Sequence, residues 1–297
     1  MGRKYFYDVT IFPNWDYRQA NENLIEDRPP IKSKIDLQND LWVGEIPDDD
    51  AHKIMDSCEP KGFNFNPYRQ YEQLYTFVRE NSLDEINWDS DEKLQLCIAL
   101  SRIIHPTNIS FQYAAKVITD EDKKIIEIIP GPISGSGSDA FNSITGQNWL
   151  SESDGKQLKD IMHAYMINPL REPISRALWY HEFASRVYEL EVRWALINTG
   201  IEALIHTDKY NSTKQFVVRV PQLAKKVGIT ISEDEARDMY DLRSALVHGQ
   251  NPSGSKIISL YQSMEKILRE VIKKSILDPK FSSFLEDKNK IKSIWSI

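Results

Sequence analysis

The sequence predicts a mainly α-helical protein of two domains, an α+β N-terminal domain followed by an all-α helical bundle. At 297 residues the chain is long for one compact domain and comfortable for two. A cluster of Gly, Ser and Pro at 131–139 separates short mixed segments from long helical ones. We therefore expect domains at 1–130 and 150–297, joined by a Gly/Ser-rich linker or loop at 131–149.

The first 130 residues carry both strand and helix signals. Segments rich in aromatic and β-branched residues predict strands at 5–11, 40–43, 110–119 and 124–129. The last two flank a polar run and are expected to form a hairpin. Residues 68–81 and 90–104 have the spacing of amphipathic helices. The polar stretch 19–34, with Pro29 and Pro30, predicts an extended connector.

Helical spacing dominates the second half and predicts a bundle. The expected helices are 152–166, 174–206, 213–227, 232–248 and 255–276. Pro221 predicts a kink or break in the third, which Gly228 should end. Ser232 and Glu235 form a capping-box pattern at the start of the fourth, and Gly249 should close it.

Charge is unevenly distributed along the chain. Residues 1–149 hold 15 Lys and Arg against 25 Asp and Glu, a net charge of −10, whereas residues 150–297 hold 22 against 19, a net charge of +3. The second half could therefore approach a phosphate backbone, although it lacks the dense basic stripe of proteins that bind long duplexes.

Several classes of protein are not indicated. No stretch is apolar for long enough to serve as a signal peptide or membrane span, so we expect a cytoplasmic protein with no membrane partner. Cys58 and Cys97 are too few for a disulfide framework or zinc site. The helical histidines lack metal-ligand spacing, and we expect neither a metal nor another cofactor.

Polar residues gather on one part of the predicted helix 232–248. Tyr240, Ser244 and His248 follow one another at four-residue spacing, and Arg243 lies beside Ser244. Leu242, Ala245 and Leu246 occupy the remaining, core-facing side. This face offers a phenol, a guanidinium, a hydroxyl and an imidazole next to the helix end.

The segment Tyr-Asp-Leu-Arg-Ser-Ala-Leu-Val-His-Gly at 240–249 resembles the R-x(4–6)-H motif of the HEPN superfamily, and its context resembles the Apea-like and abortive-infection branch. Residues 195–205 are similar to the central helix of that branch, with Glu202 at the position of its acidic residue. The resemblance covers about half of the chain. It implies a HEPN-like helical domain at 150–297.

The resemblance also implies an activity. HEPN ribonucleases cut RNA without a metal, so Arg243 and His248 are the expected catalytic residues: His248 as general acid/base and Arg243 as the phosphate clamp. Ser244, Glu202 and Tyr240 would support them, Glu202 by orienting Arg243 or His248. The family further implies RNA as substrate, a homodimer with a composite site, and a role as a toxin or in antiviral defence or stress. We expect the N-terminal domain to sense a trigger or regulatory partner and to restrain the nuclease.

Alternatives remain at the sequence level. Gln250 stands where one HEPN subclass has a tyrosine that its antitoxin modifies, so that form of control is not indicated. Arg243 and His248 could instead be a surface ion-pairing residue and a helix-terminal residue. The aromatic group of Trp179, Tyr188 and Trp194 is more typical of core or dimer interface than of base stacking. The rival function is a non-catalytic helical module for dimerisation and RNA or nucleotide binding.

Overall fold

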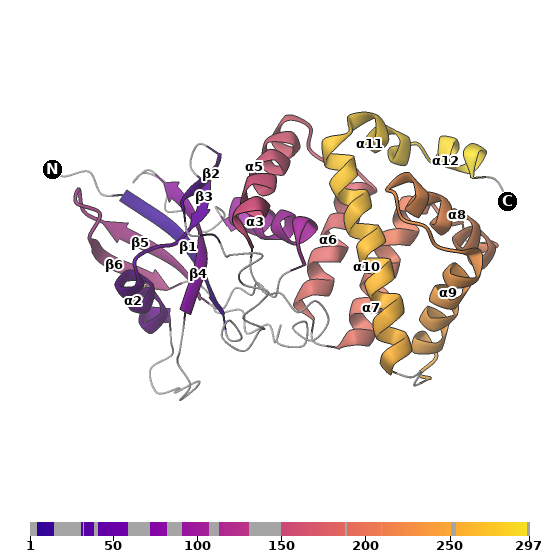
Figure 1. Cartoon of the computed structure of the whole chain (residues 1–297), viewed down its shortest axis with the longest axis horizontal. Coiled ribbons are helices and arrows are strands. Elements are labelled where there is room, and N and C mark those ends of the chain that lie inside the picture. Colours follow the sequence, from indigo (N-terminus) through magenta and orange to yellow (C-terminus); the bar gives the residue numbers. More distant parts are fainter. Residues whose placement is uncertain are drawn as a thin grey trace. The chain divides into compact units, whose positions relative to one another are not determined.

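The computed structural model describes residues 5–14, 31, 33–38, 41–58, 72–81, 91–106, 113–130, 150–187, 189–208, 210–250 and 254–295. The chain divides into two compact units, Met1–His163 and Ala164–Ile297. Figure 1 shows that the described strands belong to the N-terminal part of the chain and that the described elements after residue 150 are helices. The prediction of a mainly helical chain with its sheet in the N-terminal half is confirmed.

The first unit contains a six-stranded sheet in the order β2-β3-β4-β1-β5-β6, with every neighbouring pair antiparallel. Its strands are β1 (Tyr5–Asn14), β2 (Ile35–Gln38), β3 (Leu41–Gly44), β4 (Glu72–Asn81), β5 (Tyr113–Thr119) and β6 (Ile125–Pro130). In β1, Val9 lies opposite Val78 on one side and Ala115 on the other. The predicted strands and the β5–β6 hairpin are confirmed.

The helix predicted at 68–81 is wrong, because Glu72–Asn81 forms strand β4. Its centre, Tyr-Thr-Phe-Val at 75–78, is aromatic and β-branched, a composition that suits a pleated strand. β1 and β3 pair with β4 on its two sides, so its backbone groups are satisfied by segments distant in sequence. The hydrophobic periodicity of one segment carries no information about its pairing with strands that are distant in the sequence. The connector predicted at 19–34 lies largely outside the described residues.

Among the described residues of this part of the chain, the helices are α2 (Asp48–Cys58), α3 (Asp91–Ile104) and α5 (Glu152–Ile167). The first was not predicted; its Ala51 and Ile54 pack against Ala115 and Val117 of β5 in a buried cluster. The predicted helix at 90–104 is confirmed as α3, where the side chain of Cys97 is buried.

The division between the two units falls within α5, later than the predicted start of the second domain. Near the start of α5, Gly155 packs so closely on the first unit that an added Cβ would lie 2.5 Å from Cδ1 of Ile35 and 2.9 Å from Cδ1 of Ile31. The beginning of this helix therefore belongs with the sheet. The predicted linker at 131–149 lies outside the described residues.

The second unit is a helical array. Its helices after α5 are α6 (Ile174–Arg186), α7 (Leu190–Ile205), α8 (Ser212–Lys226), α9 (Glu233–Val247), α10 (Gly254–Leu277), α11 (Pro279–Glu286) and α12 (Lys288–Ile294). α10 contacts α6, α7, α8 and α9, so it forms the spine of the unit (Figure 1). Gly200 of α7 allows close approach, since an added Cβ would lie 3.0 Å from Cδ2 of Leu268 on α10. α11 and α12 were not predicted.

The single helix predicted at 174–206 is wrong, because it is divided into α6 and α7. Val187 and Glu189 are both extended, with ψ values of 141° and 121°. The buried Arg193 donates from Nε to the Val187 carbonyl and thus holds the break in place. Hydrophobic periodicity continues across this point, which is why the sequence conceals it. α8, in contrast, continues through Pro221.

Candidate functional site

Helix α9 carries Tyr240, Arg243 and Ser244, with His248 directly after it, and the two ends of the helix follow from local chemistry. Ser232 caps it, with Oγ accepting the Glu235 N–H at 3.0 Å. Three acidic residues in the first turn suit the positive end of the helix dipole. At the other end His248 is the C-cap, and Gly249 adopts φ +70°, which favours glycine and turns the backbone away. The predicted helix boundaries are confirmed.

Arg243 is joined to Glu202 of α7. Its Nη2 donates to Glu202 Oε2 at 3.3 Å, with side-chain exposures of 35% and 17%. Burial raises the pKa of the Glu202 carboxyl, and the Arg243 cation opposes part of that rise. The structure thus places Glu202 at Arg243, one of the two residues that Glu202 was expected to orient. Since a guanidinium has five N–H donors, this pair leaves others for an anion.

Tyr240 supports the same arginine from one turn earlier. The Arg243 Cζ atom lies 5.8 Å from the centre of the Tyr240 ring. The phenol oxygen is 3.1 Å from Ser212 Oγ at the start of α8, and the ring lies against Phe216, with centroids 5.5 Å apart. Tyr240 is therefore a structural link from α8 through α9 to Arg243.

His248 is exposed at the end of α9. Its backbone N–H donates to the Ser244 carbonyl at 3.1 Å. Its imidazole makes no hydrogen bond with any of the described residues. Ser244 is half-buried between Arg243 and His248. Five positions along a helix correspond to about 7.5 Å along the axis, so Arg243 and His248 can meet only on a ligand that extends over the helix end.

The structure therefore links three of the predicted residues, Glu202, Tyr240 and Arg243, by side-chain contacts. Ser244 and His248 join them through their positions on α9 alone. The arrangement combines an anchored cation with an accessible imidazole, two groups that suit phosphate binding and proton transfer.

Within the described part of the chain, no group of three or more His, Cys, Asp or Glu residues could hold a metal ion. The other helical histidines of the second unit have structural contacts. His181 is buried with Nε2 2.9 Å from Glu265 Oε1, and His206 Nε2 is 2.8 Å from the Leu285 carbonyl. Of the aromatic group that the sequence indicated, Trp194 lies in the core at 1% exposure, while Tyr188 lies outside the described residues.

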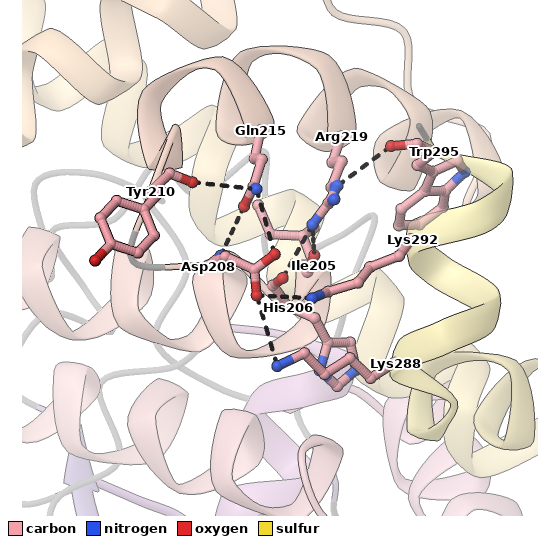
Figure 2. Close-up of polar contacts among 9 residues, drawn as sticks. All are labelled: Ile205, His206, Asp208, Tyr210, Gln215, Arg219, Lys288, Lys292 and Trp295. Carbon is pink, nitrogen blue, oxygen red and sulfur yellow. Dashed lines mark hydrogen bonds and ion pairs between the residues drawn. The ribbon is translucent and has the colours of Figure 1, made fainter. Parts of the chain in front are cut away.

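A second polar cluster lies at the junction of α7 and α8 (Figure 2). The buried Arg219 donates to the carbonyls of Ile205, His206 and Trp295, and so binds the end of α7 to the end of α12. His206 itself adopts φ +50° as the C-cap of α7. This cluster, and Ser212 beside it, were missed because single polar residues around a turn form no sequence motif.

The chain matches no protein-family model, no curated protein and no solved structure. In the described residues, no helix has both the length and the apolar character that crossing a membrane requires.

Proposed function

We propose that this chain is a metal-independent endoribonuclease that cleaves RNA by attack of a 2′-hydroxyl on the adjacent phosphate. One observation carries the proposal: the helix end that presents His248 also holds Arg243, anchored by Glu202 at 3.3 Å. Both residues belong to the segment that resembles the HEPN ribonuclease motif.

The proposed reaction needs a proton acceptor, a proton donor and a cation. His248 takes the proton of the 2′-hydroxyl, the 2′-oxygen forms a bond to phosphorus, and the bond from phosphorus to the 5′-oxygen breaks. The leaving 5′-oxygen receives a proton from an imidazolium, in the proposed composite site that of His248 in a second protomer. The products are a 2′,3′-cyclic phosphate and a 5′-hydroxyl, so atoms and charge balance without an external reactant.

Arg243 stabilises the negative charge that grows on the non-bridging phosphate oxygens. Its planar guanidinium suits bidentate contact with a phosphate, and Glu202 and Tyr240 restrict its motion. Glu202, Tyr240 and Ser244 are positioning residues in this proposal, because they act through Arg243 or through the end of α9.

The resemblance to the Apea-like and abortive-infection branch supports a homodimer in which two α9 ends form one composite site. It also supports a role as a toxin or in antiviral or stress defence. The first unit would then restrain the nuclease until a trigger or partner binds. A truncated chain, residues 150–297, should cut RNA faster than the full chain; activity no higher than that of the full chain contradicts restraint.

The experiment that tests the reaction uses two synthetic RNAs that differ at one nucleotide. Total RNA first identifies a cleaved sequence, and the oligonucleotide is then made with ribose or with 2′-deoxyribose before the scissile phosphate. The proposal predicts cleavage of the first, with a 2′,3′-cyclic phosphate end, and an intact second. Cleavage of the deoxy substrate at the same bond contradicts it. Binding without cleavage of either supports the non-catalytic module.

A further inference from the structure

Tyr210, in the loop between α7 and α8, has an unusually exposed ring. At 76% exposure it exceeds the other exposed large hydrophobic side chains among the described residues. Figure 2 shows the ring directed away from the polar cluster that surrounds the rest of the loop. Covering a large exposed aromatic side chain with a flat apolar surface removes it from water and lowers the free energy.

The backbone that carries this ring is fixed by hydrogen bonds with the side chain of Gln215. Gln215, buried in the first turns of α8, donates from Nε2 to the Tyr210 carbonyl at 3.3 Å. Its Oε1 accepts the Asp208 N–H at 2.6 Å (Figure 2). One buried amide thus fixes both sides of the loop. A ring on a fixed backbone loses little conformational entropy when a ligand binds it.

The charge of the loop is compensated. Asp208 Oδ1 lies 2.8 Å from Lys292 Nζ and 3.6 Å from Lys288 Nζ (Figure 2). The hydrogen bond from Lys292, together with the charges of both lysines, holds the pKa of Asp208 below its ordinary value. Because two cations face one carboxylate, the loop does not repel a phosphate chain.

The loop is linked to the candidate site through Ser212 and Tyr240. Tyr210 stands two residues before Ser212, whose hydroxyl contacts the Tyr240 phenol. The Tyr240 ring in turn lies 5.8 Å from Cζ of Arg243, and α8 packs against α9. The segment that precedes α8 is therefore connected through Ser212 and Tyr240 to Arg243.

We infer that Tyr210 stacks on a nucleobase of single-stranded RNA whose backbone passes Arg243 and His248. This inference rests on the proposed function and adds its substrate class. An aromatic side chain can stack on any of the four bases, since each has a π face, and it can do so only where the base is not already stacked in a duplex. The substrate is thus an unpaired segment, with little preference for the base at this position.

The test measures binding apart from cleavage in the full-length protein. The probe is a short single-stranded RNA, 2′-O-methylated so that it cannot be cut, with one 2-aminopurine whose fluorescence falls on stacking. The proteins are the wild type, Tyr210→Ala, Tyr210→Phe and the control Phe183→Ala, which removes another exposed aromatic ring on α6. We expect Tyr210→Ala to weaken binding about tenfold and to abolish the fluorescence change. Tyr210→Phe and Phe183→Ala should match the wild type.

Two further measurements distinguish a failure of the inference about Tyr210 from a failure of the proposed function. Cleavage of unmethylated RNA by Tyr210→Ala should show a raised KM with kcat little changed. A duplex RNA probe should bind the wild type and Tyr210→Ala with equal affinity. If the wild type binds and cuts RNA while Tyr210→Ala retains its affinity and fluorescence change, the inference is overturned and the proposed function stands. If the wild type neither binds nor cuts RNA, both are overturned.

Discussion

The Arg243 guanidinium lies 3.3 Å from the Glu202 carboxylate, a contact that joins helix α9 to helix α7 across 41 positions of sequence. Neither side chain is fully exposed, and the pair lies beside the ring of Tyr240. A cation held in this way suits the proposed contact with a phosphate, since less of its motion remains to be lost on binding.

Replacing Glu202 by Gln should change how stability depends on pH. Because burial raises the pKa of Glu202, the folded protein binds more protons than the unfolded chain between the ordinary value of 4.5 and the raised value. The contribution of this group to stability is present below 4.5 and is lost as pH rises through the raised pKa. The stability of Glu202→Gln relative to the wild type should therefore increase with pH over that window. Urea unfolding at a series of pH values measures it, and a pH-independent difference contradicts the assignment.

Two substitutions at Tyr240 should separate its hydroxyl from its ring. Tyr240→Phe removes the 3.1 Å contact with Ser212 and should cost about 1 kcal/mol of stability with cleavage retained. Tyr240→Ala also removes the ring beside Arg243 and should lower kcat. Thermal unfolding and cleavage kinetics measured on the same samples test this. Equal activity in the two variants excludes a positioning role for the ring.

Arg219→Ala should destabilise the second unit without a direct effect on chemistry. The change deletes hydrogen bonds to three carbonyls at the ends of α7 and α12, two of them in buried surroundings, a loss of about 2–4 kcal/mol. The matched control is Arg237→Ala on the exposed surface of α9, where the expected change is within about 0.5 kcal/mol. Chemical denaturation followed by tryptophan fluorescence compares them. Similar stability of the two variants contradicts the anchoring role.

The proposed composite site requires two chains. Light scattering should give twice the monomer mass of 34.5 kDa at concentrations where RNA is cut. Specific activity should fall on dilution as the dimer dissociates. A monomer that retains full specific activity at every dilution contradicts a shared site.

Local signals in the sequence were sufficient where an element depends on its own residues. Ser232 and Gly249 marked the ends of α9, and the strands at 113–119 and 125–130 were evident from their composition. The expectation that Glu202 meets Arg243 or His248 depended on the motif, and the structure places Glu202 at Arg243.

The wrong predictions concern elements whose structure depends on contacts outside the segment itself. β4 is a strand because β1 and β3 flank it, and α6 separates from α7 because the Val187 carbonyl bonds to a buried Arg193. Tyr210 could not be recognised from the sequence, since a tyrosine in a polar turn carries no signal until its exposure is known.

Single-turnover cleavage of labelled RNA in the presence of EDTA tests the proposed site and its metal-independent chemistry most directly. It compares the wild type with Arg243→Ala and His248→Ala, and with Arg237→Ala and His163→Ala as controls that remove exposed side chains of the same types. We predict cleavage by the wild type and both controls, and a loss of about 100-fold or more in each site variant. Cleavage that persists unchanged in Arg243→Ala and His248→Ala, or that EDTA abolishes in the wild type, would contradict the proposed site and its chemistry.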